Sequence, residues 1–473
     1  MKNMNYEIVI GLEVHVQVKT QSKIFCPCPV DSSAAANTNI CPVCCGYPGT
    51  LPVFNHKALE MAVRAGLALN CRINPRIYFE RKNYFYPDLP KGYQISQYKL
   101  PLAENGFLEL ASGKKIGITR VHLEEDAGKL VHKENYSLVD LNRAGTPLME
   151  IVSEPDIRSP QEAFEYLTYL KMSMQYAGVS DCDMEKGSLR CDANISLRKT
   201  GDTKLGIRVE LKNMNSFRGV REALEYEADR QAKLLDSGET VVQETRLWDV
   251  DNGRSQVMRT KEESHDYRYF PEPDLPDFLV AQAVIDEQKK FVGESPLARH
   301  KRFVEEYKLS ESEITILVND KRLADFFENA CRAYPEPKKI VNWLLGPFLE
   351  QVNVLPGGLD EVKISVENFA KVVRLFSEGK MNNLAAKKAL ALSMAADRDV
   401  DEIVKTEGLV QVSGEADLTM FVDATIRENA KAVEQYRAGK LEAVMFLVGQ
   451  VMKKTQGKAN PRVVKEMLEK SLK

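Results

Sequence analysis

Residues Thr119–Asp156 read TRVHLEEDAGKLVHKENYSLVDLNRAGTPLMEIVSEPD, and carboxylates stand near both ends of this stretch. Glu124, Glu125 and Asp126 follow one another directly, and adjacent carboxylates repel each other unless a cation or a basic group offsets them. Glu150 lies inside an apolar, strand-like run, where burying a carboxylate costs several kcal/mol. A hard divalent cation accounts for both features, and Mg²⁺ suits carboxylates that also face a substrate phosphate. The alternative is a solvated acidic turn and a strand glutamate that faces water.

Four segments alternate between apolar and polar residues with the period of a half-buried strand. In Gly11–Lys19, GLEVHVQVK, the apolar residues fall on one face and Glu13 and His15 on the other. The same alternation recurs in Ile118–Glu125, Ser188–Arg198 and Gly206–Asn213. The polar faces of these three segments carry Arg120, His122, Glu124, Arg190, Asp192, Asn194, Arg208, Glu210 and Lys212. Several one-sidedly apolar strands predict an antiparallel sheet with a charged concave face, rather than strands with merely wet outer faces.

The chain divides into a sheet-rich first part and a helical remainder. A length of 473 residues exceeds what one core supports, so several domains are expected. The proline-broken segment Asp266–Pro276 closes the first part, and amphipathic helical patterns begin at about Ser295. These patterns cover 295–308, 310–334, 337–352, 365–378 and 381–395, and a last helical segment begins at Gly408. The prediction is an α+β protein with an antiparallel-sheet domain over 1–294, an all-helical domain over 295–407 and a small helical tail domain over 408–473.

Composition and missing motifs exclude several classes of protein. The hydrophobic content of 44% is that of a globular chain, and no run approaches the ~20 apolar residues of a membrane span. The start, MKNMNYEIVIGLEVHV, has no signal-peptide pattern, so a cytoplasmic protein is expected. A net charge of −3 excludes a generally basic nucleic-acid binder but leaves room for a local basic patch. The motifs GxxxxGK[ST], GxGxxG, GxSxG and HExxH are absent, so any ATP use is not of the P-loop type and nothing resembles an amide-hydrolysing nucleophile.

Two cysteine pairs lie close together in Phe25–Gly46, FCPCPVDSSAAANTNICPVCCG. The pairs are Cys26-x-Cys28 and Cys41-x-x-Cys44. Two close pairs separated by a short polar loop predict a closed, tetrahedral four-cysteine zinc site with a structural role. Cys45 could compete as a ligand, and buried or redox-active cysteines are the alternative explanation.

Two segments combine positive charge with features that suit nucleic acid. Arg81–Tyr98, RKNYFYPDLPKGYQISQY, interleaves bases with aromatic rings, which fits a nucleotide or an RNA end equally as well as a tyrosine-rich structural loop. Near the C-terminus a turn separates two basic helices, where phosphate-backbone binding competes with a solvated helix as the interpretation. The basic residues singled out there are Lys453, Lys454, Lys458 and Arg462.

Taken in order, these segments resemble the B subunits of the tRNA-dependent Asp/Glu amidotransferases. The resemblance rests on long pieces that span nearly the whole chain: VIGLEVHVQVKTQSKIFCPCP, both cysteine pairs, RKNYFYPDLPKGYQISQY, ITRVHLEEDAGK, VDLNRAGTPLMEIVSEPD, GSLRCDANISLR, ELKNMNSF, DYRYFPEPDLP and FLVGQVMKKTQGKANP. It implies a sheet-based cradle domain, a helical domain and a tail domain that is associated with tRNA. It also implies two partners: an amidase subunit that hydrolyses glutamine to supply ammonia, and a small linker subunit.

The chemistry that the resemblance implies has two steps. ATP phosphorylates the side-chain carboxylate of Glu misacylated on tRNA-Gln, or of Asp on tRNA-Asn, and ammonia then displaces the phosphate to leave the amide. Which of the two tRNAs is the working substrate stays open. The residues expected to hold Mg²⁺ are Glu13, His15, Glu125 and Glu150, with Glu124 as the alternative to Glu125 if the strand register turns it inward. His15 is a less usual Mg²⁺ ligand and binds either directly or through water.

Further residues on the same faces receive supporting roles within this scheme. Lys82, Arg190 and Lys212 are candidates for contacts to phosphate, and Asp192 and Glu210 are candidates for a second metal or for support of the first. Two other hypotheses stay open. A zinc-containing tRNA-binding adaptor without catalysis predicts no ATP turnover, and a stand-alone metal-dependent hydrolase predicts activity without tRNA or a partner.

Overall fold

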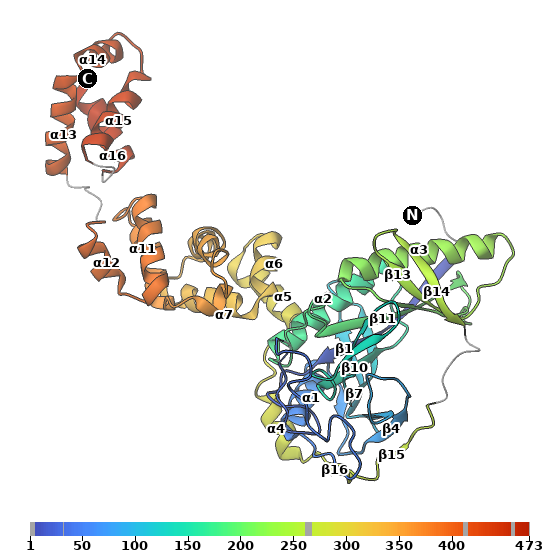
Figure 1. Cartoon of the computed structure of the whole chain (residues 1–473). Coiled ribbons are helices and arrows are strands. Elements are labelled where there is room, and N and C mark those ends of the chain that lie inside the picture. Colours follow the sequence, from blue (N-terminus) through green and yellow to red (C-terminus); the bar gives the residue numbers. More distant parts are fainter. Residues whose placement is uncertain (1–4, 32, 261–266, 410–414, 456–458, 473) are drawn as a thin grey trace. The chain divides into compact units, whose positions relative to one another are not determined.

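A computed structural model of the chain describes residues 5–31, 33–260, 267–409, 415–455 and 459–472. The chain forms two compact units, Met1–Arg299 and His300–Lys473 (Figure 1). The first unit combines a large sheet with helices, and the second is helical. The predicted α+β class is confirmed. The division into three domains, with boundaries after 294 and 407, stays a prediction. The first of the two units ends at Arg299, inside helix α5 (Pro296–Tyr307).

The first unit is built on a nine-stranded sheet in the order β14-β13-β12-β11-β1-β10-β7-β6-β2. Neighbouring strands are antiparallel, as predicted, except for β12 and β13, which run parallel. The strands are β1 (Tyr6–Gln17), β2 (Arg72–Ile73), β6 (Ala103–Glu109), β7 (Lys115–Glu125), β10 (Pro147–Ser153), β11 (Leu189–Lys199), β12 (Val209–Lys212), β13 (Glu244–Asp249) and β14 (Arg254–Thr260). The first strand of the chain therefore lies in the middle of the sheet.

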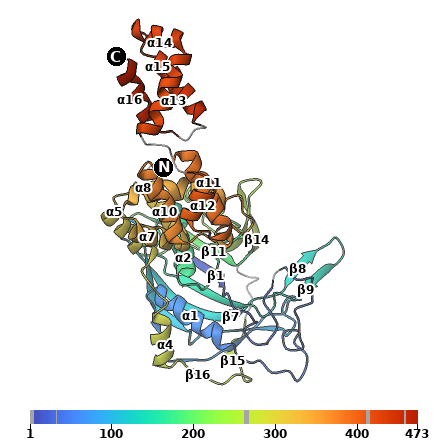
Figure 2. The ribbon, with the colours of Figure 1, turned by 90° about the vertical axis from the view of Figure 1, so that its left-hand side faces the viewer.

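One face of the sheet is covered by helices, and this face carries the core. Leu12, Val14 and Val16 of β1 are completely buried there. The covering helices are α1 (His56–Ala68), α2 (Pro160–Tyr176) and α3 (Phe217–Asp236), which pack on β6, β7, β11 and β14 (Figures 1 and 2). Alternation along each strand then turns the polar residues to the opposite face. The apolar and polar faces predicted from the sequence are therefore the helix-covered face and the open face of the sheet.

Short strands and loops border the open face. A three-stranded sheet joins β4 (Glu80–Asn83), β5 (Tyr93–Ser96) and β15 (Phe270–Pro271), and β5 packs on β7. Strand β16 (Phe278–Leu279) pairs with β3 (Arg76–Ile77), and α4 (Gln282–Lys289) follows. A hairpin of β8 (Lys129–His132) and β9 (Ser137–Asp140) projects from this unit (Figure 2). The proline-broken segment after Tyr267 forms only short strands, in line with its composition.

The second unit follows the predicted helical segments with two corrections. The segment 310–334 is two helices, α6 (Glu311–Asn319) and α7 (Lys321–Ala333), because Asp320 is extended and its side chain caps α7 by accepting from the Arg322 amide. The segment 337–352 is α8 (Pro337–Trp343) and α9 (Leu349–Val352) joined by a π-helical turn that contains Pro347, which cannot donate a backbone hydrogen bond. The remaining helices before residue 409 are α10 (Val366–Ser377), α11 (Asn383–Ala396) and α12 (Val400–Thr406).

The C-terminal segment is a small helical bundle with a core of its own. Its helices are α13 (Glu415–Glu428), α14 (Ala430–Arg437), α15 (Ala443–Lys454) and α16 (Pro461–Leu472). Leu418, Leu447 and Leu468 are completely buried in this core. Among the described residues, no helix combines the length and the apolar character that crossing a membrane would require.

Candidate active site

The open face of the sheet brings one histidine and two glutamates together. Antiparallel pairing sets His15 of β1 opposite Glu150 of β10, and Glu124 of β7 projects from the same face. His15 Nε2 lies 3.5 Å from a Glu124 oxygen and 3.6 Å from a Glu150 oxygen. One ligand atom from each of the three residues lies within 4.8 Å of the other two. This acidic cluster, defined as His15, Glu124 and Glu150, can hold a divalent cation and leave positions for water or phosphate.

A second, buried histidine completes the charge balance of the acidic cluster. His122 Nε2 lies 3.4 Å from Glu150 and 3.7 Å from Glu124. Burial alone would lower the pKa of His122, but the two carboxylates outweigh burial and raise it to about 9. Burial would likewise lower the pKa of His15, and the same carboxylates raise it. The His122 imidazolium and the His15 ring therefore both face the two carboxylates when no metal is bound.

The carboxylates respond in the opposite direction. Burial would raise the pKa of Glu150, but the charge of His122 and hydrogen bonds from both histidines hold it well below its usual range. Burial would also raise the pKa of Glu124, which His122 and His15 lower. Both glutamates are consequently ionised at neutral pH and ready to bind a cation.

Glu125 lies away from the acidic cluster. It ends β7 and forms an ion pair with Lys91, with one N–O distance of 2.6 Å, and its carboxylate accepts a hydrogen bond from the Ile95 amide at 2.9 Å. The alternation along β7 explains this placement, because His122 and Glu124 share the open face and Glu125 follows on the other side. The structure thus brings Glu124, the alternative named from the sequence, to His15 and Glu150.

Glu13 lies two residues before His15 on β1, on the same face of the strand as the acidic cluster. Its carboxylate accepts a hydrogen bond from Asn194 Nδ2 at 2.9 Å, and burial together with the charge of Glu150 raises its pKa. It does not belong to the close group of three that the described residues form. A cleft of about 240 Å³ opens beside Glu13. Its lining comes from β1, β10, β11 and the loop before β12: Val9, Gly11, Leu12, Glu13, Val152, Ser153, Pro155, Asn194, Ile195, Ser196, Leu205, Gly206 and Arg208.

Arg190 is held beside the acidic cluster by Asp126. The Arg190 guanidinium donates to one Asp126 oxygen at 2.8 Å, and Gln17 Nε2 donates to the other at 2.8 Å. Asp126 is buried, whereas the Arg190 side chain is 38% exposed and therefore within reach of a ligand. Both Asp126 oxygens already accept hydrogen bonds, so Asp126 orients the Arg190 guanidinium and is not available to bind a metal.

The other predicted phosphate ligands are two lysines. Lys82 of β4 lies with its Nζ 4.7 Å from the ring centre of Tyr267. Burial would lower the pKa of Lys82, but Glu124 raises it, so this lysine is a cation beside the acidic cluster. Lys212 of β12 pairs with Asp192 and lies 3.1 Å from Glu210. The two acids named as candidates for a second metal or for support of the first thus share one lysine, whose single charge offsets only one of them.

The four predicted zinc ligands converge on one point. The sulfur atoms of Cys26, Cys28, Cys41 and Cys44 lie within 4.8 Å of one another, and Cys45 is not part of this group. A hydrogen bond from Cys26, with help from the nearby charge of Lys23, lowers the pKa of Cys44 to about 4. Lys23 is completely buried, and its Nζ lies 3.5 Å from the Cys44 sulfur. Four convergent sulfurs with a buried cation beside them fit a negatively charged zinc–thiolate centre.

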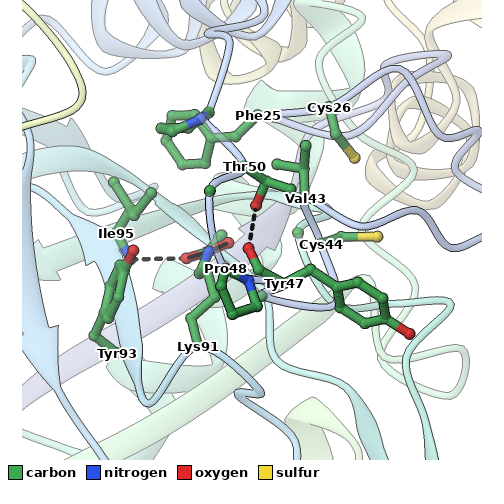
Figure 3. Close-up of a pocket in the computed structure, with 15 residues that line it drawn as sticks. Phe25, Cys26, Val43, Cys44, Tyr47, Pro48, Thr50, Lys91, Tyr93 and Ile95 are labelled. Atoms are coloured by element: carbon green, nitrogen blue, oxygen red, sulfur yellow. Dashed lines mark hydrogen bonds and ion pairs between the residues drawn. The ribbon is translucent and has the colours of Figure 1, made fainter.

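The zinc loop also forms one wall of a cleft of about 220 Å³ (Figure 3). Cys26 and Cys44 lie on one side of this cleft and Tyr93 and Ile95 on the other, with Pro48 between them (Figure 3). The ion pair between Lys91 and Glu125 lines the same cleft. The zinc loop therefore packs beside the end of β7, the strand that carries Glu124.

Comparison with known proteins identifies the family. Residues 8–286 match the family described as GatB/GatE catalytic domain, and residues 325–472 match the GatB domain. The chain is 50% identical over 473 residues to the B subunit of the aspartyl/glutamyl-tRNA(Asn/Gln) amidotransferase of Thermoanaerobacter pseudethanolicus, covering 99% of this chain and 100% of the relative. The chain belongs to the B subunits of the Asp/Glu-tRNA(Asn/Gln) amidotransferases. The equivalent protein of Carboxydothermus hydrogenoformans is 49% identical over 475 residues, covering 99% of each chain, and that of Persephonella marina is 50% identical over 474, covering 99% of this chain and 100% of the relative.

The basic tail of this amidotransferase chain is only partly available to a ligand. Lys453 is exposed at the end of α15, whereas Lys454 lies 2.6 Å from Glu428. Arg462 in the first turn of α16 lies 3.2 Å from Glu466. Lys458 lies outside the described residues. Surface ion pairs of this kind are weak and salt-sensitive, so phosphate groups could replace Glu428 and Glu466 as the partners of Lys454 and Arg462.

Two residues beside the acidic cluster received no role from the sequence. His122 was placed on the polar face but received no role, although its position two residues before Glu124 gave a sufficient signal. Asp126 was read only as part of an acidic run, and its partners Gln17 and Arg190 come from distant strands. No local pattern could have joined those three residues.

Proposed function

We propose that this chain is the phosphorylating and amidating subunit of a tRNA-dependent amidotransferase. It uses ATP to activate the side-chain carboxylate of Glu on misacylated tRNA-Gln, or of Asp on misacylated tRNA-Asn, and gives Gln-tRNA or Asn-tRNA for translation in the cytoplasm. The observation that carries the proposal is the acidic cluster of His15, Glu124 and Glu150 with cations close by. Such a cluster fits phosphoryl transfer, where positioning and charge neutralisation supply most of the catalysis.

The donor set fits Mg²⁺, because two ionised carboxylates and one imidazole face an open surface. His15, Glu124 and Glu150 would hold the ion, and Glu13 lies close enough on the same face to contribute through water. When bound, Mg²⁺ neutralises charge on phosphate oxygens. The cleft beside Glu13 lies next to the acidic cluster and would take the base and ribose of ATP. Lys82, Arg190 and Lys212 would face the phosphates.

The chemical balance assigns separate tasks to this chain and its partners. The substrate carboxylate oxygen attacks the γ-phosphorus, the bond to the ADP oxygen breaks, and an acyl phosphate forms. Ammonia then attacks the acyl carbon, inorganic phosphate leaves, and the amide nitrogen loses a proton. The resemblance to amidotransferase B subunits implies that an amidase (glutaminase) subunit supplies the ammonia and that a small linker subunit completes the heterotrimer, and the missing amide-hydrolysing motifs agree with this division.

The remaining features support binding and rigidity. Lys453, Lys454, Lys458 and Arg462 of the tail would contact the tRNA backbone. The zinc at Cys26, Cys28, Cys41 and Cys44 would be structural, because a closed four-thiolate site leaves no open position for a substrate.

The test is ATP hydrolysis by the chain assembled with its amidase and linker partners. We expect turnover with misacylated Glu-tRNA-Gln or Asp-tRNA-Asn, and none with uncharged tRNA, because the carboxylate is the phosphoryl acceptor. The product is read as ADP, and the amide is read on the tRNA after glutamine is added. Tight tRNA binding without any ATP turnover would instead favour a zinc-containing adaptor. Activity of the isolated chain without tRNA would favour a stand-alone hydrolase.

Cation binding to the acidic cluster is expected to release protons. In the free protein His122 is protonated at neutral pH, since the glutamates raise its pKa to about 9, and they also raise the pKa of His15. A cation that binds His15 and both carboxylates competes with these protons, so the affinity for Mg²⁺ rises as the pH increases towards 9. The expected slope is about tenfold per pH unit for each proton released. Calorimetric titration in two buffers with different ionisation enthalpies measures the number.

The matched variant for this titration is His122→Gln. It removes the proton of His122 but no proposed ligand, so proton release should fall while binding persists. A heat of binding that is identical in both buffers for the wild-type protein would contradict the protonated state of His122.

A further inference from the structure

An aromatic surface lies beside the acidic cluster, and the proposed phosphoryl transfer does not use it. Tyr98 is 48% exposed, and its ring stacks on that of Tyr269 with centres 4.6 Å apart and planes inclined by 14°. Tyr267 meets Tyr269 edge-on with centres 6.2 Å apart. We call Tyr98, Tyr267 and Tyr269 the tyrosine platform. Tyr267 and Tyr269 are half-buried, so Tyr98 supplies the exposed ring, and an exposed ring next to a site is typical of a binding surface.

Two basic side chains link the tyrosine platform to the acidic cluster. The Arg120 guanidinium lies 5.7 Å from the ring centre of Tyr98 and 3.9 Å from a Glu150 oxygen. Lys82 lies 4.7 Å from the ring centre of Tyr267, and the negative charge of Glu124 raises its pKa. A ligand that stacks on the platform therefore meets positive charge at both edges and has one end directed at the acidic cluster.

The rings are held in place before any ligand arrives. Glu80 is completely buried, and one of its oxygens accepts hydrogen bonds from the amides of Tyr98 and Lys99, both at 2.8 Å. On the other side, Asn83 donates through its backbone amide to the Tyr267 carbonyl at 3.0 Å and through its side chain to the Arg268 carbonyl at 2.8 Å. Strand β4 therefore fixes Tyr98 through Glu80, and it fixes the segment with Tyr267 and Tyr269 through Asn83.

A partly buried ion pair holds the segment that carries Tyr267 and Tyr269. Arg81 of β4 donates two hydrogen bonds to the buried carboxylate of Glu272, at 2.7 and 2.8 Å, and Phe270 pairs with Arg81 in the sheet. This pair is bidentate, so it resists displacement. A platform ordered in advance spares a ligand the entropy of arranging three side chains.

We propose that the tyrosine platform stacks the base of the terminal adenosine at the unpaired 3′ end of the aminoacyl-tRNA. The amino acid esterified to this adenosine would then extend past Arg120 towards Glu150. This inference rests on the proposed function, because it takes an aminoacyl-tRNA as the substrate. A single-stranded end suits the surface because aromatic stacking reads any exposed base face and the adjacent cations meet the phosphates.

ATP is the other source of an adenine ring, and the geometry favours the tRNA end. The cleft beside Glu13 already offers a site for ATP between β1, β10 and β11. The platform lies instead next to β7, since Tyr98 follows β5, which packs on β7, and Arg120 belongs to β7. The two adenosines thus reach the acidic cluster from different strands, as donor and acceptor of a phosphoryl group must.

The test is a binding cycle on the assembled heterotrimer without ATP. Fluorescence anisotropy measures the affinity for uncharged tRNA-Gln, and for tRNA-Asn, with and without the 3′-terminal adenosine. Removing the adenosine is expected to weaken binding to the wild-type complex by roughly tenfold or more. The variant Tyr98→Ala is expected to bind intact tRNA as weakly as the wild type binds the truncated tRNA, with little further loss on truncation. The variant Tyr98→Phe keeps the ring and should behave like the wild type.

Each other outcome overturns the proposal. Equal losses on truncation in the wild type and in Tyr98→Ala would show that the adenosine binds elsewhere. A Tyr98→Ala complex that binds intact and truncated tRNA as the wild type does would remove the adenosine from the platform. A raised KM for ATP, measured separately in the turnover assay, would then assign the platform to the nucleotide. A Tyr98→Phe complex as weak as Tyr98→Ala would point to the hydroxyl instead of the ring. Because the cycle contains no ATP, it can succeed even if the tRNA-dependent ATP turnover proposed above is never observed, so the two proposals fail separately.

Discussion

Replacing Glu150 with glutamine is expected to abolish tRNA-dependent ATP turnover by the assembled enzyme while leaving the fold intact. Glu150 is the one carboxylate of the acidic cluster that lies within 4 Å of His15, His122 and Arg120 alike. The amide of glutamine has nearly the same volume but cannot offset these cations or hold Mg²⁺ as a carboxylate does. We expect a loss of at least about a hundredfold in kcat, which is typical when a charged group at a phosphoryl-transfer site is removed. The measurement is ADP formation with saturating misacylated tRNA.

Two comparisons make this result interpretable. Glu222→Gln changes a glutamate on helix α3, on the helix-covered side of the sheet, that pairs with Arg218 at the surface, and it should retain full turnover. The Glu150→Gln complex should still bind tRNA with wild-type affinity, since the tail and the tyrosine platform are unchanged. Full ATP turnover in Glu150→Gln would remove the acidic cluster from the mechanism, and the glutamate would then be structural.

Loss of the zinc is expected to have the second large effect. The variant Cys44→Ser removes a thiolate whose pKa is lowered to about 4 and leaves Lys23 buried without its anionic partner. The free energy of binding a structural metal contributes directly to the stability of the fold. Losing the metal should therefore lower the free energy of unfolding by several kcal/mol. Elemental analysis should find about one zinc ion per wild-type chain and almost none in the variant. Amide formation should fall as well, because the zinc loop walls the cleft next to Glu125.

Cys45→Ser is the matched control for the zinc prediction. Cys45 follows Cys44 directly but lies outside the group of four convergent sulfurs. Its replacement should leave the zinc content and the thermal unfolding midpoint unchanged. A zinc content that fell equally in both variants would show that Cys45 contributes to the site.

The sheet and the acidic cluster could largely be predicted from the sequence because period-two alternation sets the face of every strand residue. Alternation put His15 on the polar face of its strand, and Glu150 was singled out as a carboxylate inside an apolar run; the pairing of β1 with β10 brings the two together. The same rule, applied strictly to β7, selects Glu124 with His122 and not Glu125. The expected ligand set named Glu125 first and Glu124 as the alternative, and the strand register turns Glu124 towards His15.

The partners of these residues could not be predicted, because they come from segments far apart in the chain. Lys91, which pairs with Glu125, lies 34 residues before it in the loop that leads into β5. Tyr267, which lies against Lys82, is brought to β4 by hydrogen bonds across 184 residues. Local spacing carries no signal for such contacts, and only the tertiary structure reveals that an aromatic loop and a proline-broken segment form one surface.

The central position of β1 has a consequence for synthesis of the chain. This strand is made first, but its neighbours β10 and β11 end only at Ser153 and Lys199. At typical translation speeds the ribosome needs roughly ten seconds or more to produce the missing neighbours. During this interval the newly made strand has two unpaired edges and an apolar face, which makes it a natural client for chaperones that shield nascent strands. The cysteine loop that follows β1 is complete by Cys44, so zinc capture can order this region long before the sheet closes.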